Sequence, residues 1–295
     1  MTKITPKRTI ANLLKKALDW YRSQRELPSP DSVAPHKEVK LQTSALRKTN
    51  DYRKIIYKSA IALKLAHLWQ LAPMEVAEKL AKYSRNKGVI NLSGNTPDEW
   101  AARIEVTVVP PGLLLFELTD GGIAAWLQYF CEGVPLSVGG GDLQFLVPDA
   151  LFKIQYSHAR CCSLLRMAAS GDRLSPLPDT NTFALETPKF FSWEETDGGL
   201  RLKHPAERGL IWQLFSIWDL LYFPTATPEE INWQKAATAL SEAFQFFYSQ
   251  CRIFGEVKIE NPELAKARFG LIFITKYLLR RLLEEKLKIK APREL

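Results

Sequence analysis

Residues 154–166, Ile-Gln-Tyr-Ser-His-Ala-Arg-Cys-Cys-Ser-Leu-Leu-Arg, combine an aromatic ring, an imidazole and two guanidinium groups in one short segment. Its apolar positions recur at spacings of three and four, which predicts an amphipathic helix. The two arginines, Arg160 and Arg166, lie off the apolar stripe beside Tyr156 and His158. They could bind an anionic partner, but a core helix with a solvated basic face explains the same pattern.

Patterns that would indicate a metal site or catalysis are absent from the sequence. His36, His67, His158 and His204 show no paired-ligand spacing, so we expect no metal. The cysteines Cys131, Cys161, Cys162 and Cys251 show no CxxC spacing, and this cysteine use fits a reducing cytoplasm. No GxSxG, GxGxxG or GxxxxGK[ST] string occurs. We therefore expect no cofactor and no stand-alone enzyme.

The charge of this 295-residue chain is unevenly placed. The formal net charge is +8, yet residues 1–90 carry 19 Lys and Arg against 7 Asp and Glu, and residues 91–150 carry 1 against 8. Residues 251–295 are basic again, with 11 against 6. Two basic ends would suit a polyanion, although solvated faces would look the same. No apolar run is long enough to span a membrane, so we expect no membrane partner.

The N-terminal half is predicted to mix helices and strands. Helical spacing covers residues 1–25 and about 51–70, and Pro73 lies near the start of a further helix. The period then changes: residues 104–109 and 113–118 are β-branched or apolar runs joined by Pro-Pro-Gly, which is typical of a strand, a turn and a strand. Further signals are a short strand at 39–41, a capping box at 96–99 and a glycine-rich linker within 132–149.

The C-terminal half is predicted to be helical. A loop over about 171–200 follows the opening helix, and the next helix buries Trp212, Phe215 and Trp218 as core. The capping box Thr227-Pro-Glu-Glu230 is expected to start another helix. Asn261 is expected to cap a long final helix.

Two strings of this half resemble a known family. QYSHARCCSLLR is similar to QYAHARICSILR, the opening helix of the DALR anticodon-binding domain of arginyl-tRNA synthetases. LSEAFQFFYSQCRIF, from residue 240, is similar to the family's LAEAFHRFYNECRVL, and the tail APREL is similar to APERM. The resemblance implies an all-α anticodon-binding bundle over residues 151–295.

The first part also resembles arginyl-tRNA synthetases, through their N-terminal additional domain. The matching strings are Asp51-Tyr52, Leu63-Lys-Leu-Ala66, Pro73 through Ala81, and 104–116, in the family's order. The resemblance implies a small α+β domain over residues 1–135, an antiparallel sheet with helices, which in the synthetases meets the D-loop of tRNA. Leu113 and Leu115 depart from the family, because they replace the aromatic and the asparagine that read the D-loop base.

The family's catalytic domain is missing between these two parts. Residues 136–150 stand in its place as a linker, and no HIGH-like or KMSK-like string occurs in the chain. Since class I aminoacylation needs these motifs to hold ATP and stabilise the adenylate transition state, we expect no arginine activation. The resemblance therefore indicates a mainly α synthetase paralogue without catalytic activity, a pseudoenzyme. We expect it to be cytoplasmic and to act in translation.

What the resemblance implies for binding is a tRNA site, with arginine tRNA as the expected partner. Tyr248 and Arg252 would face the anticodon loop, and Tyr156 and Arg160 would position the opening helix near the tRNA stem. Basic residues of the last helix would supply charge or shape: Arg268, Lys276, Arg280 and Arg281. The alternatives are a protein-interaction scaffold, for which Leu113 and Leu115 would form an apolar contact surface, or an accessory subunit of a separate synthetase.

Overall fold

The structure, a computed structural model, describes residues 3–25, 46–86, 102–132, 149–171 and 191–295. The chain forms two compact units. The first comprises residues 1–122 and 219–225, and the second comprises residues 123–218 and 226–295. The domain boundaries predicted at 135 and 151 stay predictions, because residues 133–148 lie outside the described part of the chain.

The first unit is built on a four-stranded antiparallel sheet with strand order β1-β2-β4-β3. Strand β3 (Ile104–Val109) and strand β4 (Leu113–Leu118) occupy the two runs predicted as strands and pair antiparallel from Ile104 with Leu118 to Val109 with Leu113. Gly112 closes their turn at a φ of +132°, and a Cβ there would lie 2.9 Å from Pro73. Only glycine fits this turn.

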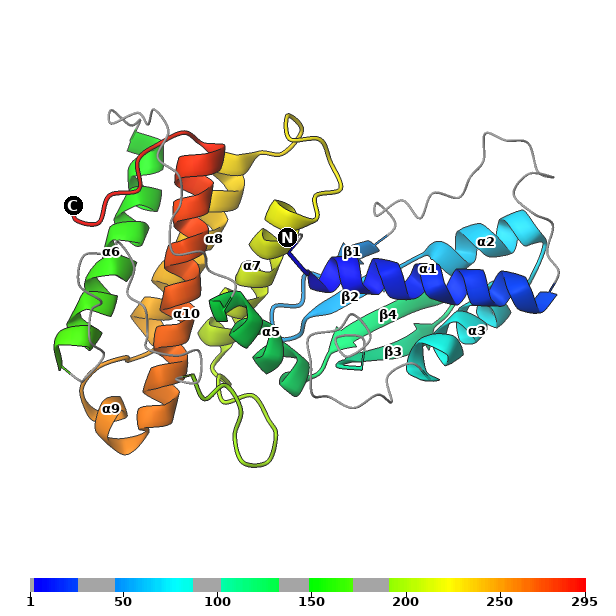
Figure 1. The fold of residues 1–295 in the computed structure, drawn as a ribbon, viewed down its shortest axis with the longest axis horizontal. Helices are drawn as coiled ribbons and strands as arrows, with labels where there is room; N and C mark the ends of the chain where they lie inside the picture. Colours follow the sequence, from blue (N-terminus) through cyan, green and yellow to red (C-terminus); the bar gives the residue numbers. More distant parts are fainter. Residues whose placement is uncertain (1–2, 26–45, 87–101, 133–148, 172–190) are drawn as a thin grey trace. The chain divides into compact units, whose positions relative to one another are not determined.

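Three helices pack in the first unit: α1 (Pro6–Arg25), α2 (Ile61–Trp69) and α3 (Pro73–Asn86). Figure 1 shows them together on one side of the sheet. Each buries an apolar stripe, as the spacing predicts; in α1 the stripe is Ile10, Leu13, Leu14, Ala17, Leu18 and Tyr21. In the same unit, the buried carboxylate of Asp219 accepts hydrogen bonds from the Tyr57 hydroxyl (2.5 Å) and the Lys7 N–H (3.2 Å).

The helix predicted over about 51–70 is wrong in its first half. Residues Ile56–Ser59 form strand β2, which pairs with β4 on one side and with β1 (Leu46–Lys48) on the other. Local apolar spacing cannot reveal the pairing with β4, since that strand lies far along the sequence. The short strand predicted at 39–41, the capping box at 96–99 and the linker glycines lie outside the described residues.

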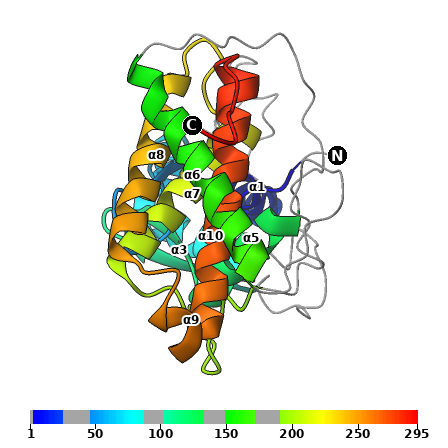
Figure 2. The same cartoon turned by 90° about the vertical axis from the view of Figure 1, so that its left-hand side faces the viewer.

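The second unit is a helical bundle, as predicted. Helices α6 (Asp149–Gly171), α8 (Trp233–Gln250) and α10 (Pro262–Arg281) run side by side (Figures 1 and 2). Helix α5 (Asp120–Glu132) and helix α7 (Pro205–Tyr222) contribute the aromatic core, where the rings of Phe130 and Trp218 stack 4.1 Å apart. The short helix α9 (Glu256–Glu260) precedes α10, and a π-helical turn, η4 (Leu282–Lys286), follows it.

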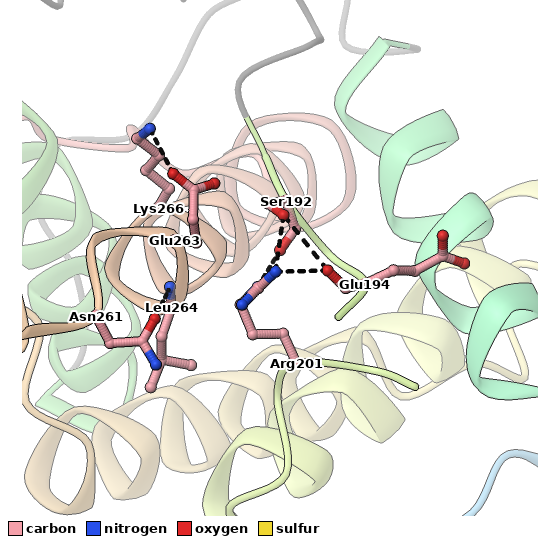
Figure 3. A network of polar contacts seen from close by, with 7 residues as sticks. All are labelled: Ser192, Glu194, Arg201, Asn261, Glu263, Leu264 and Lys266. Atoms are coloured by element: carbon pink, nitrogen blue, oxygen red, sulfur yellow. Dashed lines mark hydrogen bonds and ion pairs between the residues drawn. The ribbon is translucent and has the colours of Figure 1, made fainter. Parts of the chain in front are cut away.

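Two predicted helix starts have different outcomes. Asn261 caps α10 as predicted, because its side chain accepts the Leu264 N–H at 3.0 Å (Figure 3). At Thr227 the capping contact forms, with the Thr227 N–H donating to Glu230 Oε2 at 3.0 Å, but the segment is a turn. Helix α8 begins at Trp233, where Asn232 accepts the Lys235 N–H at 2.8 Å.

The described end of the predicted 171–200 loop is an ordered turn. The Arg201 guanidinium donates to the Ser192 carbonyl (2.9 Å) and to the Glu194 carbonyl (2.6 Å), which closes the turn (Figure 3). The Trp193 ring packs against Gly270 of α10, so closely that a Cβ at Gly270 would lie 2.8 Å from Trp193 Cζ2. Phe215 and Trp218 are buried in the core, as predicted, while Trp212 is half-buried.

Candidate nucleic-acid interface

Arg160 of α6 and Tyr248 of α8 contact each other, although they are far apart in sequence. The Arg160 guanidinium donates to the Tyr248 hydroxyl, and its Cζ lies 4.9 Å from the centre of the Tyr248 ring. The Tyr248 ring also stacks with the buried ring of Phe244, with the ring centres 6.2 Å apart. The two predicted residues thus form one half-exposed cation–π unit.

Buried hydroxyl groups set the register of these two helices. Ser157 Oγ and Ser241 Oγ are 2.6 Å apart, and the Ser241 hydroxyl also donates to the Lys153 carbonyl at 3.1 Å. The Gln245 amide donates to Ser157 Oγ at 3.0 Å. Because buried polar groups lose free energy unless they are paired, these bonds specify one alignment of α6 and α8. That alignment places Arg160 opposite Tyr248.

Tyr156 lies one helical turn before Arg160 on α6. Its side chain is 47% exposed, so its ring is accessible from solvent. The spacing of four residues puts Tyr156 and Arg160 on the same face of the helix. The result is an accessible aromatic ring adjoining the Arg160–Tyr248 unit.

Arg252 and Arg268 meet at the turn that follows α8. Arg252 is 78% exposed and forms an ion pair with Glu256 at 3.2 Å. Arg268 is largely buried and is paired with the buried carboxylate of Glu207 at 2.6 Å. Its guanidinium also donates to the Arg252 carbonyl at 2.5 Å. Arg268 therefore holds the turn in place, whereas Arg252 presents its charge to solvent.

The other predicted basic residues of α10, Lys276, Arg280 and Arg281, have different surroundings. Lys276 and Arg280 act electrostatically on the buried His158 of α6, and Arg280 also pairs with Glu284 at 2.8 Å. Arg281 donates to the Tyr277 hydroxyl at 3.1 Å and pairs with Glu285. The predicted residues do not all meet in one place.

His158 is buried as a neutral imidazole. Its Nδ1 lies 2.8 Å from the Pro292 carbonyl, which can only accept, so Nδ1 carries the proton. Burial lowers the pKa of His158 to about 4, and the positive charges of Lys276, Arg280 and Arg293 contribute to that shift. His158 thus packs in the core and donates a hydrogen bond to the tail.

Leu113 and Leu115 lie on one face of β4. The residues that alternate with them along the strand, Leu114, Phe116 and Leu118, are buried on the opposite face. Both are half-buried, and Leu115 pairs across the sheet with Lys58 and Thr107, whose side chains are exposed. This face therefore offers aliphatic groups in place of an amide or an aromatic ring.

Two negative findings concern the described residues. Across residues 3–25, 46–86, 102–132, 149–171 and 191–295, no group of three or more His, Cys, Asp or Glu side chains could hold a metal ion. Within the same ranges, every helix is too short or too polar to cross a bilayer.

Comparison with known proteins identifies the class of the second unit. Residues 154–295, just under half of the chain, match the DALR anticodon binding domain family. The region that contains the α6–α8 contact is therefore a DALR anticodon-binding domain, and it is homologous to the C-terminal region of arginyl-tRNA synthetases. The family match covers this domain and no catalytic domain.

The curated relatives are much longer proteins. The chain is 36% identical to an arginine–tRNA ligase of Gloeobacter violaceus over 135 residues, which are 44% of this chain and 20% of that protein. It is 31% identical to an arginine–tRNA ligase of Synechococcus sp. (strain JA-3-3Ab) over 139 residues, 47% of this chain and 21% of that protein. The chain thus matches about a fifth of each relative's length. No solved structure matches it significantly.

The contacts between α6 and the C-terminal tail, residues 287–295, were not predicted from the sequence. Gln155 donates to the Lys290 carbonyl at 2.8 Å, and Arg166 donates to the Arg293 carbonyl at 3.3 Å and pairs with Glu294. The acceptors in the tail are mostly backbone carbonyls. Because every residue has a backbone carbonyl, the residue types of the tail do not predict this contact with α6. The basic character of Arg166 and Arg293 was the one signal available.

Proposed function

We propose that the chain binds tRNA through its DALR domain, with the anticodon stem-loop of arginine tRNA as the ligand. The observation that carries the proposal is the contact between Arg160 and Tyr248. It joins residues from the two strings of the sequence that resemble the family most closely. We further infer a cytoplasmic role connected with translation.

The chemistry of the pair suits a single-stranded loop. Unpaired bases stack on aromatic rings and on guanidinium planes, at about 1–3 kcal/mol per base. Tyr156 supplies an exposed ring on the same helix face as Arg160. Arg252 supplies an exposed charge, and its surface ion pair with Glu256 contributes too little to prevent exchange for a phosphate.

The direct test is retention of total tRNA by the purified chain at two salt concentrations, followed by sequencing of the retained RNA. We expect enrichment of arginine tRNAs, and about tenfold weaker binding when Tyr248 is changed to Ala, the loss of one stacked base. Arg252→Ala should weaken binding mainly at low salt.

Phe246→Ala is the matched control. Phe246 is an exposed aromatic residue on the same helix, 58% accessible, and its two-residue offset from Tyr248 directs it to another face. Equal losses for the Phe246 and Tyr248 variants would contradict the site. Unselective binding that disappears with salt would leave only generic attraction between charges.

We also propose that the chain does not aminoacylate tRNA. The support is the absence of HIGH-like and KMSK-like strings from its sequence. The assay is arginine- and ATP-dependent charging of arginine tRNA by the purified chain, with an active arginyl-tRNA synthetase as the positive control. We expect no product above background, and appreciable charging would refute this part of the proposal.

A second candidate function is a protein-interaction scaffold or an accessory subunit of a synthetase. It is favoured by Leu113 and Leu115, which place aliphatic groups on a half-exposed face of β4. An accessory subunit would bind an arginyl-tRNA synthetase, so the test of that role is co-elution of the two purified proteins. Loss of co-elution in a Leu115→Asn variant, with tRNA binding unchanged, would support the accessory-subunit role; absence of co-elution would remove it.

A further inference from the structure

Four basic side chains from three segments gather on one side of the DALR domain. Arg166 comes from α6, Lys276 and Arg280 come from α10, and Arg293 comes from the tail, residues 287–295. All four positive charges act on the buried Cys162 thiol, where they oppose the rise in pKa that burial causes. We name these four residues the basic cluster.

The tail is fixed against α6 by hydrogen bonds along its backbone. The Gln155 amide holds the Lys290 carbonyl at 2.8 Å, and His158 holds the Pro292 carbonyl at 2.8 Å. Arg166 holds the Arg293 carbonyl at 3.3 Å. Ile289 and Ala291 are buried. In Figure 1 this segment runs from the end of α10 to α6. The fold therefore places the Arg293 backbone beside Arg166.

The charges of the basic cluster oppose one another. Burial lowers the pKa of Lys276, and the neighbouring charges of Arg280 and Arg293 lower it further. The imidazole beneath them, His158, is neutral and offers no compensating charge. Like charges held close together raise the free energy of the site unless an anion joins them.

Glu284 and Glu294 form ion pairs with residues of the basic cluster. Glu284 pairs with Arg280 at 2.8 Å and belongs to the π-helical turn that follows α10. Glu294 pairs with Arg166 at 3.3 Å, and its side chain is 80% exposed. An exposed ion pair of this kind is weak, so an incoming anion can displace Glu294.

We propose that the basic cluster binds a phosphate group of the RNA backbone, and that Glu294 occupies Arg166 until RNA arrives. The RNA part of this inference rests on the proposed function. Arginine binds phosphate through paired donors and lysine through its point charge. Arg166 lies six residues after Arg160 on α6, about 9 Å along the helix, so one RNA chain can reach both residues.

The test compares two tail variants that change charge in opposite directions. Arg293→Gln should weaken tRNA binding by the full chain about five- to eightfold near 0.1 M salt, with the difference vanishing near 1 M, the effect of one lost phosphate contact. Glu294→Gln should strengthen binding by up to a similar factor, because it leaves Arg166 without a competing carboxylate. Lys64→Gln and Glu260→Gln, at exposed positions on α2 and α9, make the same charge changes elsewhere.

Each outcome decides the matter. Opposite shifts for the Arg293 and Glu294 variants, larger than those of their controls, support the phosphate site. Equal losses in both tail variants would show that the tail acts only through packing, and shifts no larger than the controls would show long-range charge alone; either result overturns the site.

If the unmodified chain binds no tRNA, the proposed function fails separately, and inorganic phosphate becomes the probe. The cluster then stands only if phosphate, and not chloride at equal ionic strength, moves the His158 imidazole resonances. Unmoved resonances would overturn the site.

Discussion

The stability of the DALR domain should fall in mild acid because of His158. The imidazole is buried and donates to the Pro292 carbonyl, and its pKa is lowered to about 4 from an ordinary value of 6.5. A proton binds the unfolded chain more readily than the folded one throughout that interval. Stability is therefore lost as the pH falls from 6.5 towards 4, and no further loss from this residue is expected below 4.

The size of the effect follows from the shift. The full difference in pKa corresponds to about 3 kcal/mol of unfolding free energy, of which about 2 kcal/mol is lost between about pH 7 and pH 5. Carboxylates elsewhere also titrate, so the quantity to measure is the difference between the protein and a His158→Asn variant. The asparagine amide can still donate to Pro292, but it does not titrate.

The assay is denaturant unfolding of both proteins at about pH 7, 6 and 5, with NMR titration of the imidazole alongside. We expect the stability advantage of the protein over His158→Asn to shrink by about 2 kcal/mol across this range. Lys276→Gln should reduce the loss, because it removes a positive charge that lowers the pKa of His158. An advantage that stays constant with pH, or an imidazole that titrates at its ordinary value, would refute the reasoning.

Three further substitutions test the packing of the same unit. Gly270→Ala should destabilise it by about 1–3 kcal/mol in denaturant unfolding, because the added methyl group overlaps the Trp193 ring. Glu207→Ala should cost about 3–5 kcal/mol by the same measurement, because it leaves the Arg268 guanidinium buried without its carboxylate. Asn261→Ala should cost about 1 kcal/mol through loss of the α10 cap, visible as a lower unfolding midpoint.

Matched substitutions test whether each loss of stability has the stated cause. A Cβ added at Gly209 would meet nothing within 4 Å beyond its chain neighbours and the backbone of its own helix, so Gly209→Ala should be neutral or mildly stabilising. Glu207→Gln keeps the hydrogen-bond acceptor for the His204 N–H and should cost less than Glu207→Ala. An Asn261→Asp variant should retain the cap. Equal losses within any of these three matched pairs would argue against the stated cause for that pair.

Much of the fold was predictable from the sequence because its signals are local. The segments Ile104–Val109 and Leu113–Leu118 are short β-branched or apolar runs typical of strands, and Pro-Pro-Gly between them predicts a turn. Helix α1 and the cap at Asn261 likewise depend on neighbours a few residues away. The α6 segment carried both its helical period and its family resemblance in one string.

What the sequence by itself determined was therefore the local structure of these elements and the membership of the α6–α10 region in the DALR family. Tertiary structure alone decided that Ile56–Ser59 is a strand, since its partner β4 lies far along the chain. It also divided the cations: Arg160 faces Tyr248, Arg268 faces Glu207, and the tail brings Arg293 to Arg166. The sequence shows which side chains are charged. Which partner each charge finds depends on which helix faces pack against each other in the folded protein.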